Sequence, residues 1–73
     1  MNEGATITIH LAELIEKTGL SKAKFCHKAK MKNTQLNRLL NQQTTRLDIG
    51  VLIRICDTLN CGIGDLLEYK KTE

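Results

Sequence analysis

Proline and tryptophan are absent from the 73-residue sequence, and its only Phe and Tyr residues are Phe25 and Tyr69. A core with so few aromatic side chains must be built from aliphatic ones, which short amphipathic helices bury well. No apolar run approaches the roughly 20 residues that a bilayer-spanning helix needs. The N-terminal sequence, MNEGATITIH, lacks the basic and then apolar layout of a secretory signal. The composition therefore predicts a small helical protein of the cytoplasm, with no membrane partner.

The length of the chain limits the size of its core. A single domain of 73 residues buries only about 60% of the surface that its unfolded chain exposes, so its stability is marginal. A second subunit would add buried surface. We therefore expect self-association from the length of the chain.

Cysteine and histidine are present, but not in a pattern typical of a disulfide framework, a metal site or a catalytic site. The three cysteines, Cys26, Cys56 and Cys61, are odd in number and have no paired spacing. No C-x-x-C or H-x-x-x-H pair supplies zinc ligands. Neither His10 nor His27 has a recognisable nucleophile and an orienting carboxylate near it in sequence. We therefore expect reduced thiols, no metal, no cofactor, no small-molecule ligand and no enzymatic activity.

Acidic residues are missing from the middle of the chain. Residues 17–46 contain eight Lys and Arg residues and no Asp or Glu, while all eight acidic residues lie outside this range. A one-sided cationic surface attracts polyanions, of which nucleic acid is the commonest inside a cell. Composition alone leaves open a solvated basic surface without a partner.

Apolar residues at helical spacing predict five short helices. The first begins near His10 and ends at Gly19, a residue suited to a left-handed helix end. Ser21 and Asp48 are suitable N-terminal caps for the second and fourth helices, and Asn60 is expected to stop the fourth. The expected helices span about residues 10–18, 22–29, 32–41, 49–59 and, from residue 63, a last short helix.

Residues 6–9, TITI, alternate with a period of two, which indicates a short strand or an extended arm. A lone strand needs a partner, and the sequence allows either the same segment of a second copy or the C-terminal segment. The C-terminal tail, YKKTE, is expected to be frayed.

The third helix, KNTQLNRLLN at residues 32–41, has two unlike faces. Leu36, Leu39 and Leu40 form one apolar stripe that must face a core. The opposite face carries amides, a hydroxyl and a guanidinium but no carboxylate: Asn33, Thr34, Asn37, Arg38 and Asn41.

Such a face is suited to the DNA major groove. Two short helices joined by a turn of three or four residues, the second with a polar outer face, are the elements of a helix-turn-helix. Asn pairs with adenine at two points, Arg pairs with guanine at two points, and the Thr methyl packs on thymine. The third helix offers these groups, and the lack of carboxylates avoids repulsion by the phosphates beside the groove.

Residues 21–69 also resemble the lambda-repressor/Cro-like helix-turn-helix family, or XRE family, especially its small stand-alone regulators. The likeness is carried by N-x-x-L-x-x-L-L-N at 33–41, RLDI before the fourth helix, I-C-x-x-L-N-C at 55–61, and the closing GDLLEY. The resemblance implies an all-α, five-helix DNA-binding domain. It also implies a transcriptional regulator, most simply a repressor that binds a near-palindromic operator on double-stranded DNA as a homodimer.

Site residues follow from the resemblance position by position. The family's base-contacting positions fall on Asn33, Thr34, Asn37 and Arg38. Its contacts to the DNA backbone fall on Lys22, Lys32, Asn41 and Arg46. The expected organisation is therefore an N-terminal arm or strand at 1–9, the helix-turn-helix DNA-binding domain at 10–69 and a C-terminal tail at 70–73.

Two residues depart from the family pattern. Lys30 stands where the family usually has Gly or Asn, and a left-handed backbone there would cost Lys on the order of 1 kcal/mol, so a looser turn is expected. Cys26 stands where the family favours Ala, and a thiol is only slightly larger.

Two other functional classes remain open from the sequence. The same fold could serve as a protein-interaction module, such as an antitoxin or adaptor. A thiol switch or small enzyme would instead require an exposed cysteine of low pKa, which the apolar spacing around the cysteines disfavours.

Overall fold

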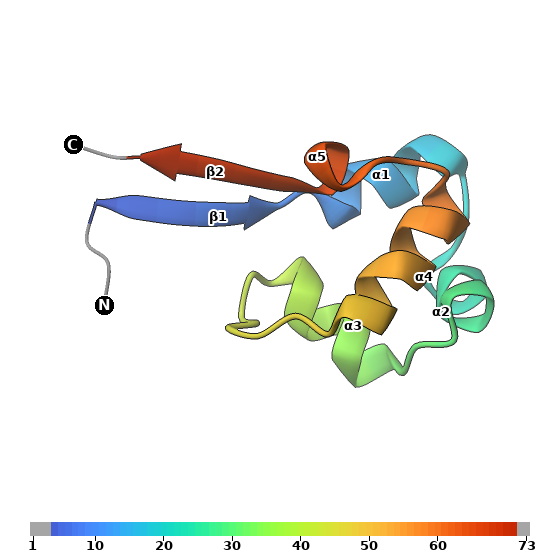
Figure 1. Ribbon diagram of the computed structural model, residues 1–73. Helices are drawn as coiled ribbons and strands as arrows, with labels where there is room; N and C mark the ends of the chain where they lie inside the picture. The colour runs from blue at the N-terminus through green and yellow to red at the C-terminus, as the bar shows by residue number, and fades with distance from the viewer. Residues whose placement is uncertain (1–3, 72–73) are drawn as a thin grey trace.

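Helices form the body of the molecule, and a two-stranded ribbon projects from it (Figure 1). The computed structural model describes residues 4–71. In chain order its elements are β1 (Ala5–Ile9), α1 (Leu11–Thr18), α2 (Lys22–Ala29), α3 (Asn33–Leu40), α4 (Ile49–Leu59), α5 (Ile63–Leu66) and β2 (Leu67–Lys71). The five expected helices are confirmed, but an all-α description is too loose because β1 and β2 form a sheet.

The ribbon settles the partner of the TITI segment. β1 pairs antiparallel with β2, so that Ile7 lies opposite Tyr69 and Ile9 lies opposite Leu67. The expectation of a frayed C-terminal tail is wrong for Tyr69, Lys70 and Lys71, which pair with β1. Its last two residues, Thr72 and Glu73, lie outside the described residues. The physical reason is that the tail forms backbone hydrogen bonds only when β1 lies beside it, a partner distant in sequence.

The core takes one fully buried large side chain from each helix. These residues are Leu11, Phe25, Leu36, Ile55 and Leu66. Ile9 of β1 is also buried, so the base of the ribbon is anchored in the same core. Within residues 4–71, no helix is long and apolar enough to cross a membrane.

The predicted helix ends are confirmed. The Ser21 hydroxyl accepts a hydrogen bond from the Lys24 N–H at 3.1 Å. The Asp48 carboxylate accepts from the N–H groups of Gly50 at 2.7 Å and Val51 at 3.3 Å. Asn60 closes α4 with a left-handed φ of 52°. These caps fix where α2 and α4 begin and where α4 ends.

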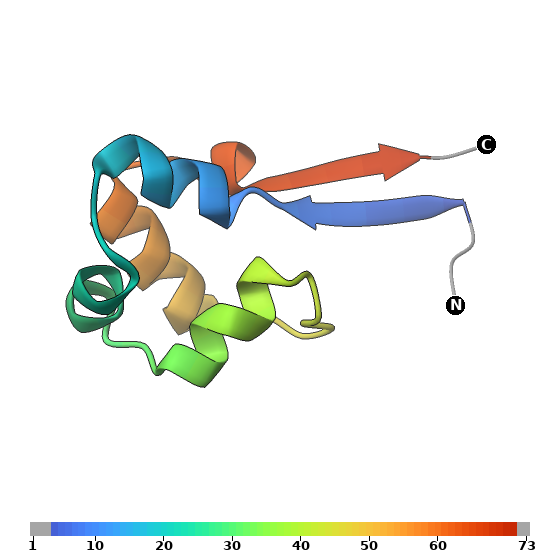
Figure 2. The same ribbon diagram turned by 180° about the vertical axis from the view of Figure 1, so that it is seen from behind.

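Gln42 joins the loop after α3 to the base of the ribbon. Its side-chain oxygen accepts from the Ile9 N–H at 3.0 Å, and its side-chain nitrogen donates to the Ile9 carbonyl at 2.9 Å. The amide therefore satisfies both backbone groups of Ile9, as a neighbouring strand would. Figure 2 shows this loop lying beside the ribbon from behind.

His10 links the start of α1 to β2. One ring nitrogen lies 3.1 Å from a Glu13 oxygen and the other lies 2.7 Å from a Glu68 oxygen. The hydrogen bond to Glu68, which is the larger cause, and the hydrogen bond to Glu13 raise the pKa of His10 above its ordinary 6.5. The protonated ring donates to both carboxylates at once.

Replacing Gln42 with Ala should lower the free energy of unfolding by about 1–3 kcal/mol, because the Ile9 N–H and carbonyl lose their partners. Urea denaturation measures this change. The matched control is Gln43→Ala, since no side-chain hydrogen bond of Gln43 is present within residues 4–71 and little change is expected. Equal effects of both substitutions would contradict the role of Gln42.

The His10 contacts should make stability depend on pH. Because the folded-state pKa is raised, the stabilisation is fully present below pH 6.5 and is lost as the pH rises through the higher folded-state pKa. Urea denaturation of the wild type and of His10→Gln between about pH 5 and 9 measures the difference. A difference that stays constant over this range would rule out the linkage.

Candidate nucleic-acid interface

The turn between α2 and α3 is closed by backbone hydrogen bonds. Lys30 adopts the left-handed conformation, with φ 56° and ψ 50°. The Met31 N–H donates to the Cys26 carbonyl at 2.9 Å, and the Lys30 N–H donates to the His27 carbonyl at 3.4 Å. Met31 is buried and anchors the turn in the core. The turn is therefore well formed rather than loose, at the conformational cost expected for a left-handed Lys.

The first turn of α3 is held by two side chains. The Gln35 oxygen accepts from the Lys32 N–H at 3.4 Å. The Cys26 thiol of α2 donates to the Asn33 side-chain oxygen at 3.4 Å. The Cys26 thiol therefore orients Asn33, the first residue of α3. It contacts the side-chain oxygen of Asn33 and not the side-chain nitrogen.

All four base-contact candidates lie at the surface. Leu36 and Leu39 are buried in the core, so the opposite side of α3 faces outward. Thr34, Asn37 and Arg38 are exposed on it, and Asn33 is exposed at its margin beside α2, where its side chain contacts Cys26. The structure thus brings together on one helix the residues that the sequence grouped.

The four backbone-contact candidates are also exposed, and they surround α3. Lys22 is the first residue of α2, Lys32 precedes α3, and Asn41 follows α3. Arg46 lies in the loop between α3 and α4. These positions place three cations and an amide at the margins of the α3 surface.

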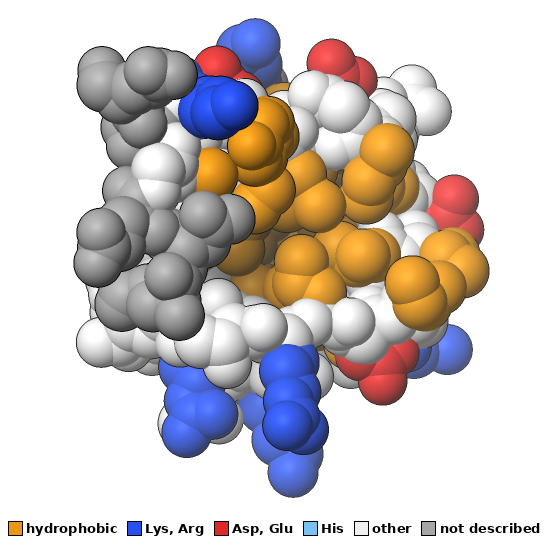
Figure 3. All heavy atoms as spheres, turned by 60° about the vertical axis from the view of Figure 1, so that its left-hand side comes forward, with side chains coloured by type: hydrophobic (Ala, Val, Ile, Leu, Met, Phe, Trp, Pro, Cys, Tyr) orange, Lys and Arg blue, Asp and Glu red, His pale blue; other side chains and the backbone are white. Residues whose placement is uncertain are grey.

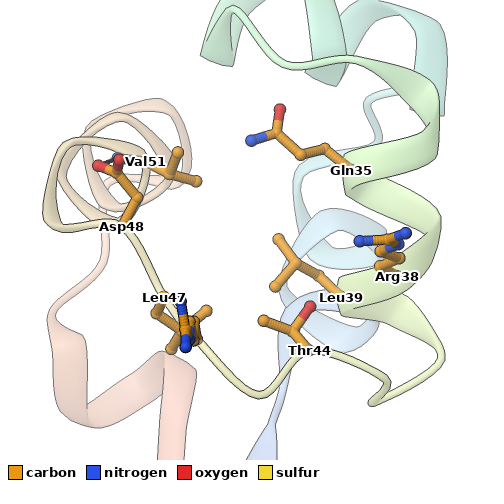
Figure 4. A pocket seen from close by; sticks show the side chains of 8 residues that line it. Gln35, Arg38, Leu39, Thr44, Leu47, Asp48 and Val51 are labelled. Atoms are coloured by element: carbon orange, nitrogen blue, oxygen red, sulfur yellow. Dashed lines mark hydrogen bonds between the residues drawn. The ribbon is translucent and has the colours of Figure 1, made fainter.

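A shallow cavity separates α3 from the start of α4 (Figure 4). Its volume is about 220 Å³, and it brings Arg38 of α3 together with Arg46 of the loop. The other lining residues are Gln35, Leu39, Thr44, Leu47, Asp48 and Val51. Sequence reasoning assigned no site role to Gln35 or Thr44, because the cavity forms only when the loop folds back toward α3.

One carboxylate, that of Asp48, lies at this cavity and is hydrogen-bonded to the start of α4. Asp48 caps α4 and accepts hydrogen bonds from two N–H groups at the positive end of the helix. The two hydrogen bonds hold the carboxylate against the start of α4.

The cations of residues 17–46 are not neutralised by neighbouring acids. All eight side chains are exposed, and none forms an ion pair with a carboxylate of residues 4–71. Figure 3 shows several Lys and Arg side chains projecting from the lower edge of the molecule, with others along its top. An unpaired cationic edge beside an amide-rich helix is the electrostatic arrangement of a polyanion-binding surface.

Arg54 is a cation with a different role. Its Nε donates to the Ala29 carbonyl at 2.9 Å, and the side chain is partly buried between α4 and the end of α2. A guanidinium at a helix C-terminus satisfies an orphan carbonyl and complements the helix dipole. Arg54 therefore positions α2 against α4, a role that its sequence context did not reveal.

The cysteines show little sign of reactivity. Cys26 is buried, and Cys56 and Cys61 are half-buried. Burial raises the pKa of the Cys61 thiol, and the adjacent Cys56 raises it further. A raised pKa lowers the thiolate fraction on which nucleophilic chemistry depends.

Comparisons with known proteins show the family and the fold of the chain. A family model described as a Cro/C1-type HTH DNA-binding domain matches residues 10–72. The crystal structure of the transcriptional regulator VanUg, form II, is similar with a TM-score of 0.73 and 20% sequence identity, over 96% of this chain and 92% of that one. At this identity the likeness shows a shared fold. A search of curated proteins finds no match.

Replacing Lys30 with Gly should raise the free energy of unfolding by about 0.5–1 kcal/mol, because Gly adopts the left-handed conformation without the steric cost. Chemical denaturation measures the gain. Lys30→Ala is the matched control, since it removes the same charge but keeps a Cβ atom. A gain of equal size in both variants would assign the effect to charge and not to the backbone.

Proposed function

The chain belongs to the Cro/C1-type helix-turn-helix DNA-binding domain family, and from this premise we propose that it is a transcriptional regulator, most simply a repressor, that binds a near-palindromic operator as a homodimer. The observation that carries the proposal is the exposed, carboxylate-free outer face of α3, surrounded by unpaired cations. A repressor of this kind acts by occluding a promoter, which requires no catalytic group and no cofactor.

Four side chains of α3 would read the bases. Asn37 and Arg38 carry the bidentate groups that match adenine and guanine, and Thr34 offers a methyl group for thymine. Asn33 differs because its side-chain oxygen already accepts from Cys26. Its amide nitrogen is then the group best placed to donate to a base acceptor. Each good bidentate pair contributes about 1–3 kcal/mol of discrimination.

The surrounding residues would hold the phosphates. Lys22, Lys32 and Arg46 supply positive charge on either side of α3, and Asn41 supplies an amide. Contacts of this kind release counterions from DNA, so they contribute affinity that falls steeply with salt and does not depend on sequence. They also fix the register in which α3 meets the bases.

A homodimer would place two copies of α3 on one face of the duplex. The half-sites of such a regulator lie about 34 Å apart, one turn of B-form DNA. The two-fold symmetry of the protein then accounts for a near-palindromic operator.

Arg38→Ala and Lys22→Ala should weaken DNA binding in different ways. On a site selected from random duplexes, Arg38→Ala should relax the preference at one base position and reduce affinity for the best site by about 1–3 kcal/mol. Lys22→Ala should weaken all duplexes alike and reduce the slope of log affinity against log salt by about one. Fluorescence anisotropy with labelled duplexes measures both effects.

Lys70→Ala is the control, because it removes one positive charge from β2, on the opposite side of the molecule from α3 in Figure 1. It should leave base preference unchanged. Equal losses on every duplex from Arg38→Ala and Lys22→Ala would contradict the division of roles. If the wild type ignores duplex DNA at low ionic strength, the proposed function is wrong.

A further inference from the structure

The structure exposes five large hydrophobic side chains that the DNA-binding surface does not use. They are Ile7 (54% exposed), Ile49 (69%), Ile53 (58%), Ile63 (51%) and Tyr69 (63%). Together they present on the order of 500 Å² of surface, which is as large as the biggest patches of typical monomers. Patches of this size commonly mark an interaction site.

Part of this surface is one side of the ribbon. Ile7 and Tyr69 lie directly opposite each other, so their side chains share a side with Ile9 and Leu67. Ile9 is buried in the core, whereas Ile7 and Tyr69 extend the same apolar side beyond the body. Thr6 and Thr8 occupy the other side of β1. The ribbon is thus an amphipathic arm whose apolar side lacks a cover within residues 4–71.

The rest of the surface is a groove along α4 and α5. It is lined by Ile49, Leu52, Ile53, Cys56, Asp57 and Ile63. Figure 3 shows hydrophobic side chains gathered around a hollow, with Lys and Arg side chains at the edges of this face. An arm and a groove, both apolar, are therefore found on one molecule.

We propose that a second copy of this chain covers this surface, and that the ribbon of each copy lies along the α4–α5 groove of the other. The proposal rests on the homodimer of the proposed function and assigns its interface. It leaves the outer face of α3 free, because none of the base-contact candidates lines the groove or the ribbon.

Charge favours a second copy as the occupant. The chain has a net charge of +3, so two copies repel each other unless they meet where cations are scarce. None of the eight Lys and Arg residues of 17–46 lines the groove, whose only ionisable acid is Asp57. Lys71, at the tip of β2, lies on the apolar side of the ribbon. In the reciprocal arrangement Lys71 and Asp57 belong to facing surfaces and carry opposite charges.

The area also fits a dimer. About 500 Å² from each copy gives a total near 1,000 Å², which reaches the lower bound for a specific interface. In a two-fold symmetric dimer the ribbon of each copy contacts the groove of the other, so the ribbon–groove contact occurs twice. An isolated two-stranded ribbon is marginally stable in water, so packing on a partner would also hold the ribbon in place.

The interface can be tested by placing a charged residue in the ribbon and, in a second variant, in the groove. Ile7→Glu alters the ribbon, and Ile53→Glu alters the groove. Each variant should weaken self-association, measured by sedimentation equilibrium, by about 100-fold or more, because symmetry buries the charge twice. Thr6→Glu is the matched control: it adds the same charge to the other side of β1 and should leave the dimer intact. Circular dichroism checks that each variant is folded.

A mixture of Ile7→Glu and Ile53→Glu tests the reciprocal arrangement. In a mixed dimer, one ribbon–groove contact carries both substitutions and the other carries neither, whereas each homodimer carries one substitution in both contacts. One contact therefore stays intact in the mixture, and association should recover in part. If ribbon packed on ribbon and groove on groove, every contact would carry a substitution and no recovery would follow. Failure to recover would therefore overturn the reciprocal arrangement.

DNA binding separates this inference from the proposed function. The two Glu variants should still bind a single half-site, but they should lose the tighter binding to a full palindrome. A wild-type chain that stays monomeric, or Glu variants that stay dimeric, would overturn the interface and leave the surface to another partner. A wild-type dimer that ignores DNA would overturn the proposed function while the interface stands.

Discussion

The joint burial of one side chain from each helix is the constraint on which the structure depends. Leu36 of α3, Phe25 of α2 and Ile55 of α4 belong to a single hydrophobic core, and the burial of Leu36 fixes the rotation of α3 about its own axis. With 3.6 residues per turn, the amides and the guanidinium of α3 must then face outward. The chemistry of the proposed DNA surface is thus a consequence of how the leucines of α3 are packed.

Much of the helical body could be predicted because its signals are local. The caps Ser21 and Asp48 and the stop at Asn60 act within one turn of the chain, and apolar spacing identifies the inner face of each helix. Only one strand of the ribbon, β1, could be predicted. Alternation marks β1, but no local signal distinguishes pairing with a distant β2 from pairing with a second copy. For the same reason the sequence alone predicts a frayed tail where residues 69–71 belong to β2.

The candidate site was predicted as a set of residues but not as an arrangement. Exposure of Asn37 and Arg38 follows from helical periodicity alone. By contrast, the thiol contact from Cys26 to Asn33 and the hydrogen bond from Arg54 to Ala29 join helices whose approach is decided by the whole core. Residue type alone does not predict such contacts. A cation that stabilises the fold therefore cannot be distinguished in the sequence from a cation proposed to bind a phosphate.

The paired hydrogen bonds of Gln42 have a mechanical consequence. They connect the root of the arm to the segment that carries Arg46, so a displacement of one that keeps both bonds must carry the other with it. Displacements of the ribbon and of the loop that carries Arg46 then share one free-energy term. Thermodynamics requires any influence between these two parts to be mutual. In this molecule, the Gln42 amide would contribute to such an influence between partner and operator.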